Sequence, residues 1–321
     1  MTDYTFPSAP LQKGVLSDLA TTLRETRLLW GPQAGTDGVC RILPLSEDQW
    51  PTLALTTLLP LKKLLLPPRE ELWNYNAGDF SPLPTAEPFA VLGVPLCDLQ
   101  AAWYLDQVFA DDEVYKARRA RSFLVGMPCE PGKNCHCDGN LMPLAGDLFI
   151  GQERVWALSP AGHAMLQACA CNLSENLPLS WPEEIAARRH AVTEKVFHAS
   201  AESTIWSEEA QHCLSCGACS AVCPTCYCFD MLDDAVLDGS VTRSRAWDNC
   251  FFAEHGKIAG GHDFRSGRIS RLRFRMEHKQ LGFGPLRGQN SCVGCGRCRE
   301  ACPVDIDLDR IAERLSEEAR P

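Results

Sequence analysis

The stretch that decides the fold is CLSCGACSAVCP (residues 213–224), and its spacing returns in CVGCGRCREACP (residues 292–303). Each copy places three thiols in one tight loop and a fourth thiol beyond it, directly before a proline. Thiolates are soft ligands, and this doubled spacing is typical of chains that bind two cubane [4Fe-4S] clusters. The pattern therefore predicts electron transfer.

The expected ligands divide crosswise between the two copies. With this spacing, three cysteines of one copy hold a cluster together with the fourth cysteine of the other copy. We expect one cluster to be bound by Cys213, Cys216, Cys219 and Cys302. The other cluster is then expected to be bound by Cys292, Cys295, Cys298 and Cys223. Zinc also binds paired Cys-x2-Cys units, but the third cysteine and the Cys-x3-Cys-Pro ending fit a cube better.

Composition narrows the class of protein. The 321-residue chain has a net charge of −10, which counts against nucleic acid as a partner because phosphate binding needs a basic face. The sequence contains no run of about 18 apolar residues, the length that would predict a membrane segment. The 18 cysteines cluster at metal-ligand spacing and no secretory signal is visible, so a disulfide scaffold is not favoured. A reducing, cytoplasmic location suits the thiolates.

The remaining pattern predicts an α+β protein, with a mixed α/β N-terminal part and a largely helical, dicluster ferredoxin-like C-terminal domain. We expect an α/β domain over residues 1–180, in which buried strands at 89–95 and 122–128 alternate with helices. A helical linker is expected over residues 181–212.

The ferredoxin-like domain is expected over residues 213–321, with an inserted segment, 224–291, between the cysteine copies. The insertion contains a basic stripe. Alternation in the part that reads Arg271-Leu-Arg-Phe-Arg275 favours a half-buried strand there.

Four further cysteines form a second constellation. Cys97 and Cys129 each follow a predicted strand, and Cys135 and Cys137 lie on a loop rich in glycine and proline. Four cysteines from one neighbourhood predict a third [4Fe-4S] cluster. The alternatives are buried structural thiols, since free cysteine packs as a small hydrophobe, or a zinc site.

The other cysteines are less informative. Cys226, Cys228 and Cys250 could tune a cluster, bind another metal, act as redox-active thiols or simply pack against a cluster. We treat Cys40, Cys169 and Cys171 as structural, and we expect neither His262 nor His278 to be a ligand.

The chain lacks the motifs of nucleotide and substrate sites. It has no Gly-x-Gly-x-x-Gly turn in a suitable context, no Walker A lysine loop and no nucleophile elbow. We therefore expect no nucleotide-binding or flavin-binding residues and no catalytic residues. Such a chain is best interpreted as a relay between other subunits.

A connected series of motifs adds a resemblance to known families. The series comprises Pro95-Leu-Cys97-Asp98, Cys129 with Cys135-His-Cys137, Cys223-Pro-Thr-Cys-Tyr-Cys228-Phe-Asp230, Trp247-Asp-Asn-Cys250, Ala259-Gly-Gly-His262, the Arg-x-Arg-x-Arg stretch and His278-Lys279. With the doubled motif, it resembles the iron–sulfur subunit shared by two families. One is the beta subunit of sulfhydrogenase, an NAD(P)-linked [NiFe]-hydrogenase, and the other is the similar iron–sulfur subunit of anaerobic sulfite reductase. The resemblance covers most of the chain from about residue 60.

The resemblance implies a relay with two kinds of partner. One partner is a flavin subunit that uses NAD(P)H, and the other is a catalytic subunit, either a [NiFe]-hydrogenase or a sirohaem sulfite reductase. We favour the hydrogenase type. The roles of the eight cysteines of the doubled motif carry over without departure.

Two other classes of function stay open. A thiol–disulfide reductase would use Cys226, Cys228 or Cys250 in catalysis. A cluster-based redox sensor would bind a regulatory partner, but the acidic balance and the lack of a nucleic-acid motif count against it.

Overall fold

The structure is a computed structural model that describes residues 5–52, 56–81, 86–137, 143–179 and 192–320. The chain divides into two units that interleave along the sequence. The first unit contains residues 1–65, 85–133 and 138–186, and the second contains residues 66–84, 134–137 and 187–321.

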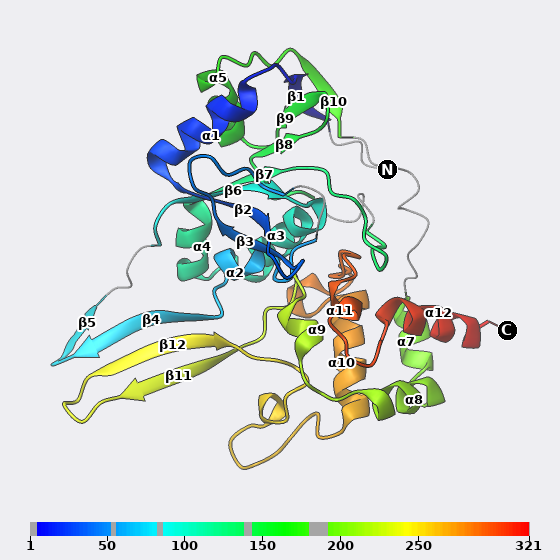
Figure 1. Cartoon of the computed structure of the whole chain (residues 1–321). Coiled ribbons are helices and arrows are strands. Elements are labelled where there is room, and N and C mark those ends of the chain that lie inside the picture. The colour runs from blue at the N-terminus through cyan, green and yellow to red at the C-terminus, as the bar shows by residue number, and fades with distance from the viewer. Residues whose placement is uncertain (1–4, 53–55, 82–85, 138–142, 180–191, 321) are drawn as a thin grey trace. The chain divides into compact units, whose positions relative to one another are not determined.

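A mixed sheet organises the first unit (Figure 1). In hydrogen-bonding order, its eight strands in the described residues are β10 (Glu175–Pro178), β1 (Thr5–Pro10), β9 (Arg154–Ala157), β8 (Leu148–Ile150), β7 (Ser122–Gly126), β6 (Phe89–Val94), β2 (Leu28–Ala34) and β3 (Cys40–Pro44). The pairs β2–β6, β6–β7 and β7–β8 are parallel and the others antiparallel. Strands β6 and β7 are buried throughout, as is typical of central parallel strands.

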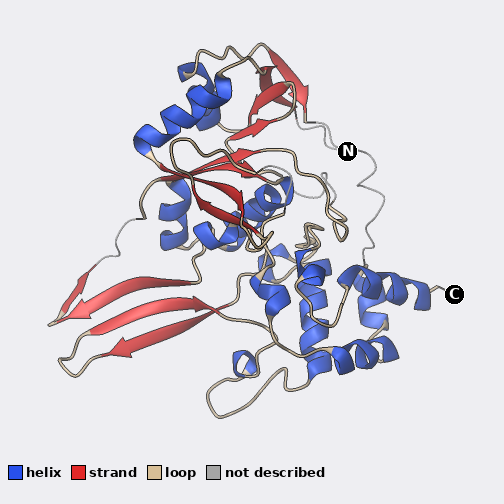
Figure 2. Ribbon diagram, in the orientation of Figure 1, coloured by secondary structure: helices blue, strands red, loops and turns tan. Residues whose placement is uncertain are grey.

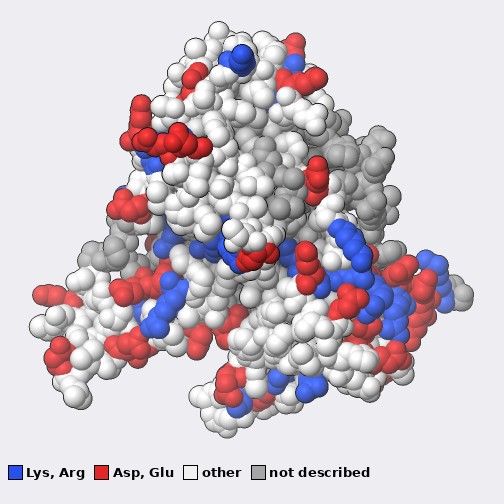
Figure 3. All heavy atoms as spheres, viewed as in Figure 1, with Lys and Arg blue, Asp and Glu red and all other residues white. Residues whose placement is uncertain are grey.

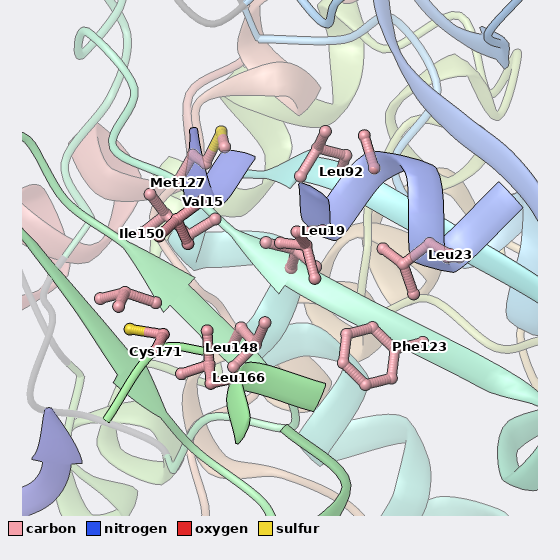
Figure 4. Packing of buried hydrophobic residues seen from close by; sticks show 14 of the residues in the cluster. Val15, Leu19, Leu23, Leu92, Phe123, Met127, Leu148, Ile150, Leu166 and Cys171 are labelled. Atoms are coloured by element: carbon pink, nitrogen blue, oxygen red, sulfur yellow. The ribbon is translucent and has the colours of Figure 1, made fainter. Parts of the chain in front are cut away.

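Helices pack against this sheet and close an aliphatic core. They are α1 (Val15–Thr26), α2 (Lys62–Leu65), α3 (Leu96–Val108), α4 (Glu113–Ala120) and α5 (Pro160–Ala168). Leu19 and Leu23 lie one turn apart on α1 and share a hydrophobic cluster with Leu92 of β6 and Phe123 of β7 (Figure 4). The helical spacing of these leucines therefore determines which face of α1 is buried.

The second unit combines a small antiparallel sheet with a group of short helices (Figure 2). The sheet contains, in order, β11 (Phe229–Ala235), β12 (Val241–Trp247), β4 (Arg69–Asn76) and β5 (Asp79–Ser81). A buried ion pair between Arg245 of β12 and Glu70 of β4, 2.5 Å from Nε to Oε1, joins two of these strands.

The helices of the second unit surround the cysteine motifs. They are α7 (Glu194–Ala199), α8 (Thr204–His212), α9 (Ala218–Ala221), α10 (Arg268–Leu281), α11 (Arg297–Glu300) and α12 (Leu308–Glu318), with 3₁₀ turns η1 (Glu254–Gly256) and η2 (Gly284–Leu286). Trp206, Met276, Ile311 and Leu315 form part of their shared core. The α+β class expected from the sequence is confirmed, and this C-terminal part is largely helical.

Some local expectations hold and one is wrong. The buried strands expected at 89–95 and 122–128 are β6 and β7. Residues 181–191 of the expected linker lie outside the described residues, and α7 and α8 follow them within the second unit. The basic stripe is not a strand: it forms α10, because the apolar and buried basic positions repeat every three to four residues over its full length.

Charges of both signs are mixed on the surface of the second unit (Figure 3). Arg314 of α12 pairs with Glu208 and Glu209 of α8, at 2.5 and 2.9 Å. On the small sheet, Arg243 pairs with Asp233 at 2.6 Å. The Arg243 pair is exposed and such pairs contribute little to stability, whereas Glu209 is buried in its pair with Arg314.

Candidate iron–sulfur site

The two loops of the doubled motif share one backbone conformation. Ser215 and Gly294, each two residues after the first cysteine, have left-handed φ values of 53° and 67°. Gly217 and Gly296, two residues further on, have φ values of 76° and 73°. Each loop then enters a short helix, α9 or α11. The repeated spacing therefore folds into a repeated tight loop.

Backbone amides donate to cysteine sulfurs at matching places. The amide of Ser215 lies 3.4 Å from Cys213 Sγ, and the amide of Gly294 lies 3.4 Å from Cys292 Sγ. Hydrogen bonds to a sulfur stabilise its thiolate form, and they help to set the potential of a cluster bound to it. Each loop thus hydrogen-bonds its first cysteine sulfur through its own backbone.

One cavity brings together the four sulfurs that we expect around the first cluster. Cys213, Cys216 and Cys219 of the first copy line it, and Cys302 of the second copy lines it too, with Cys298 also in the wall. Ser215, Arg275 and mainly apolar residues complete the lining. The cavity thus brings cysteines of both copies together, as crosswise ligation requires, and the crosswise division itself stays a prediction.

The four cysteines expected around the second cluster also lie near one another. Burial raises the pKa of the Cys298 thiol, while the Arg275 guanidinium opposes that rise. Cys292, Cys223 and Cys295 all act electrostatically on the same thiol. Cys298 therefore has the other three members of its expected set within electrostatic range.

A row of cations on α10 lies among these cysteines. Arg271, Arg275 and Lys279 follow one another at intervals of four residues, so they lie on one face of the helix. They are only 9%, 2% and 4% exposed. The Arg275 guanidinium donates to the carbonyl oxygen of Cys219 at 3.0 Å and to Cys226 Sγ at 3.3 Å. This side chain thus contacts the backbone of the first loop and a cysteine beyond it.

Lys279 reaches the chain on the other side of the first copy. Its Nζ lies 2.8 Å from Thr225 Oγ1 and 3.2 Å from Ser291 Oγ. Ser291 directly precedes the second copy of the cysteine motif. Burying a charge is costly unless an opposite charge or hydrogen bonds compensate it. A cluster held by four thiolates is anionic, so these buried cations fit a [4Fe-4S] group at this place.

The same cations favour an ionised ligand sulfur. Contact with the Cys226 thiol lowers the pKa of Cys223 well below its usual value, and Lys279 and Arg275 act in the same direction. The thiolate is the form that ligates metal. The chemistry of the donor set therefore fits the cluster that we expect Cys223 to bind.

A short segment from far upstream covers the second loop. The amide of His136 donates to the carbonyl of Gly294 at 2.8 Å, and the Cys135 thiol donates to the carbonyl of Cys295 at 3.4 Å. A Cβ added to Gly294 would lie 2.4 Å from the His136 oxygen. Although burial opposes the change, a hydrogen bond with Cys292 raises the pKa of His136 to about 9.

The upstream quartet is divided between the units. Cys97, at the start of α3 after β6, and Cys129, after β7, belong to the first unit. Cys135 and Cys137 belong to the second unit, on the segment that covers the second loop. The third cluster stays a prediction.

The cysteines outside these sets fall into two groups. Cys40, Cys169 and Cys171 lie in the first unit, where Cys40 and Cys171 are buried and burial raises the pKa of the Cys169 and Cys171 thiols. Cys226, Cys228 and Cys250 line a second cavity, described below.

Sequence reasoning missed the residues that surround the sulfurs. Arg275 and Lys279 were assigned to a strand face, although their four-residue spacing is typical of a helix. His136 stands between Cys135 and Cys137, and this position in the sequence could have indicated that it lies near the cysteines. His278 lines the second cavity, and burial together with Lys279 and neighbouring arginines lowers its pKa to about 3.

Comparison with known families agrees with this geometry. The family described as "4Fe-4S dicluster domain" matches residues 212–306, which contain both loops, α9, α10 and α11. The chain is therefore an iron–sulfur protein of the dicluster class, with [4Fe-4S] clusters as its cofactors.

Comparison with curated proteins gives the family. The chain is 32% identical over 282 residues to the sulfhydrogenase 2 subunit beta of Pyrococcus furiosus, which covers 81% of this chain and 84% of that protein. The chain belongs to the sulfhydrogenase beta-subunit family, whose members transfer electrons through iron–sulfur clusters.

A second relative is similar over a shorter region. The beta subunit of F420-dependent formate dehydrogenase from Methanocaldococcus jannaschii is 26% identical over 110 residues, which is 34% of this chain and 21% of that protein. No solved structure matches the chain. In the described residues, no helix has both the length and the apolar character that crossing a membrane requires.

Proposed function

We propose that this chain relays electrons inside a multisubunit, cytoplasmic oxidoreductase, between a flavin subunit that uses NAD(P)H and a [NiFe]-hydrogenase catalytic subunit. The family membership and the doubled cluster motif support the relay. The observation that carries the proposal is one cavity lined by Cys213, Cys216 and Cys219 of the first copy together with Cys298 and Cys302 of the second, which supports a shared cluster-binding region.

The residues of the chain have distinct tasks in this relay. A [4Fe-4S] cluster accepts and passes on one electron at a time. The eight motif cysteines hold two such clusters crosswise, and backbone amides donate to their sulfurs. Arg275 and Lys279 offset the negative charge that an added electron increases, so they favour the reduced state.

The crosswise ligation can be tested with one pair of variants. In Cys302→Ser, the thiols of Cys213, Cys216 and Cys219 should become open to alkylation in the anaerobic protein, while the second loop stays protected. In Cys223→Ser, the protection should be reversed. Cys40→Ser, which removes a buried thiol of the first unit, should retain the full iron content of the parent. Exposure of a variant's own loop instead would refute the crosswise assignment.

We also propose that Cys97, Cys129, Cys135 and Cys137 hold a third cluster. The position of Cys135 supports this, because its sulfur donates to the carbonyl of Cys295 in the second loop. Iron should then be about 12 atoms in the parent and about 8 in Cys97→Ser. About eight atoms in both proteins would exclude the third cluster and leave the two-cluster relay intact.

The partner subunits are tested by isolation of the native complex. Two partners should co-purify with the chain, a catalytic one that contains nickel and another that binds flavin. A sirohaem partner would instead select the sulfite reductase type. Oxidation of NADPH by the isolated chain would show that it has a nucleotide site of its own.

A further inference from the structure

Three cysteines of the second unit have no task in the relay. Cys226, Cys228 and Cys250 line one cavity, and the cations Arg275 and Lys279 are in its wall. Cys226 is engaged with Cys223 and with the Arg275 guanidinium, 3.3 Å away. The other two cysteines are engaged with each other, because the Cys228 thiol hydrogen-bonds with the sulfur of Cys250.

The hairpin β11–β12 produces this contact. Its last cross-strand pair is Phe229 with Trp247, so Cys228 precedes one strand and Cys250 closely follows the other. The amide of Asp248 donates to the Cys228 carbonyl at 3.0 Å and extends the pairing by one step. The register of a hairpin thus brings two thiols, distant in sequence, into contact at its base.

The pair lies directly beside the first loop. Asn249 Nδ2 donates to the carbonyl of Gly217 at 2.8 Å, which ties the turn before Cys250 to the loop. The side chain of Ser220, next to Cys219, hydrogen-bonds with Cys250. Cys250 also acts electrostatically on Cys219 itself. Electrons therefore have a short path between the pair and a cluster on this loop.

The surroundings prepare one thiol of the pair for reaction. The hydrogen bond from Cys228 lowers the pKa of Cys250 to about 6, and Arg275 and Lys279 contribute in the same direction. A thiolate next to a thiol is the arrangement from which a disulfide forms by loss of two electrons.

We propose that Cys228 and Cys250 are a redox-active dithiol–disulfide pair that exchanges electrons with the clusters of the relay. Oxidation joins the two sulfurs and releases two electrons, and the thiol proton passes to solvent through the cavity. Two [4Fe-4S] clusters accept one electron each, so the electrons balance; reduction reverses every step. The inference rests on the proposed function, because the clusters are its electron donors and acceptors.

The pair would give the relay a two-electron store. Hydride from a nicotinamide arrives as an electron pair, whereas each cube carries one electron. A disulfide takes up two electrons, so a disulfide beside the clusters would connect the two-electron chemistry of the nicotinamide with the one-electron chemistry of the clusters.

The first test is a reductive titration of the anaerobic, iron-loaded chain with dithionite. The parent should take up two more electrons per chain than Cys228→Ser or Cys250→Ser, at equal iron content. Cys40→Ser is the matched control and should equal the parent. Equal uptake in all four proteins would overturn the pair. A loss of about four iron atoms in either variant would also overturn it, because these cysteines would then be cluster ligands.

A second measurement needs no variant. The oxidised and reduced holoproteins are denatured in acid, alkylated and analysed by mass spectrometry. A Cys228–Cys250 linked peptide should be present only in the oxidised sample. Free, alkylated Cys228 and Cys250 in both samples would refute the pair, although iron content and cluster spectra would still support the relay. Absent clusters would refute the relay itself.

Discussion

The two cysteine loops have the same spacing and the same backbone, yet their surroundings differ. Leu214 of the first loop is 58% exposed, whereas Val293, its counterpart in the second loop, is 3% exposed. The segment Asn134–Cys137 lies on the second loop and hydrogen-bonds to it. On the proposed relay, we expect the first loop to exchange electrons at the surface and the second to pass them within the chain.

The same difference explains one departure between the two copies. Ser215 and Gly294 occupy equivalent positions, both at positive φ. Gly294 has no room for a Cβ beneath the His136 carbonyl. The first loop accepts a serine, at the strain that a left-handed residue with a side chain carries.

The largest expected effect comes from making the covered loop like the exposed one. Gly294→Ser should expel the covering segment, because its Cβ would lie 2.4 Å from the oxygen of His136. We expect the variant to lose the cluster at the second loop, about four iron atoms, and any iron held by Cys135 and Cys137 on the displaced segment. Iron analysis and alkylation mapping check this. Full iron content in the variant would show that the cover is not needed.

A smaller effect on stability is expected from a change at Arg275, whose side chain contacts the first loop and Cys226. Arg275→Lys keeps the charge but loses the planar fork that reaches Cys219 and Cys226. Loss of hydrogen bonds from a charged donor should lower the free energy of unfolding by about 1.5–3 kcal/mol. Denaturant unfolding of the anaerobic protein measures it. Arg273→Lys is the matched control, because Arg273 lies on the same helix but donates to the Ala201 carbonyl at 3.3 Å. A larger loss of stability in Arg273→Lys than in Arg275→Lys would contradict the stabilising role of Arg275.

The two loops should lose iron to a chelator at different rates. Cys216 is exposed, whereas Cys295 is buried. A chelator should therefore extract iron from the first loop faster, by a factor on the order of ten, which corresponds to about 1.4 kcal/mol in barrier height. Time-resolved alkylation of the two loops reports the order. Simultaneous release would mean that the cover does not shield its cluster.

The smallest effect is expected from the reciprocal change. Ser215→Gly removes the left-handed strain and a buried hydroxyl oxygen that has no hydrogen-bond partner among the described residues. The free energy of unfolding should rise by about 1 kcal/mol with unchanged iron. Thermal unfolding detects such a change. A decrease would indicate that the hydroxyl has a role in the exposed loop.

The sequence predicted what is local in this molecule. Ligand spacing fixes the geometry of a tight loop, so the two matching loops, and the meeting of cysteines from both copies in one cavity, could be expected from residues 213–224 and 292–303. The strands β6 and β7 were also predictable, because short buried apolar runs are typical of central strands.

Nonlocal features could not be obtained in this way. Five alternating residues, Arg271 to Arg275, satisfy both a strand and a helix period, and only the longer register with Lys279 identifies α10. Nothing within residues 69–76 indicates pairing with β12, and nothing in Asn134–Cys137 indicates that this segment covers a loop far downstream. Such contacts depend on tertiary packing.

The crosswise cavity has a consequence for biosynthesis. Its wall requires Cys302 as well as Cys213, Cys216 and Cys219, so the site cannot close until residue 302 has been translated. The strands and helices of the first unit precede residue 187 and can assemble earlier. On the crosswise ligation that we propose, the nascent chain would hold three thiols reduced and without metal until Cys302 is made. We therefore expect cluster insertion to be a late step, coupled to the completion of the polypeptide.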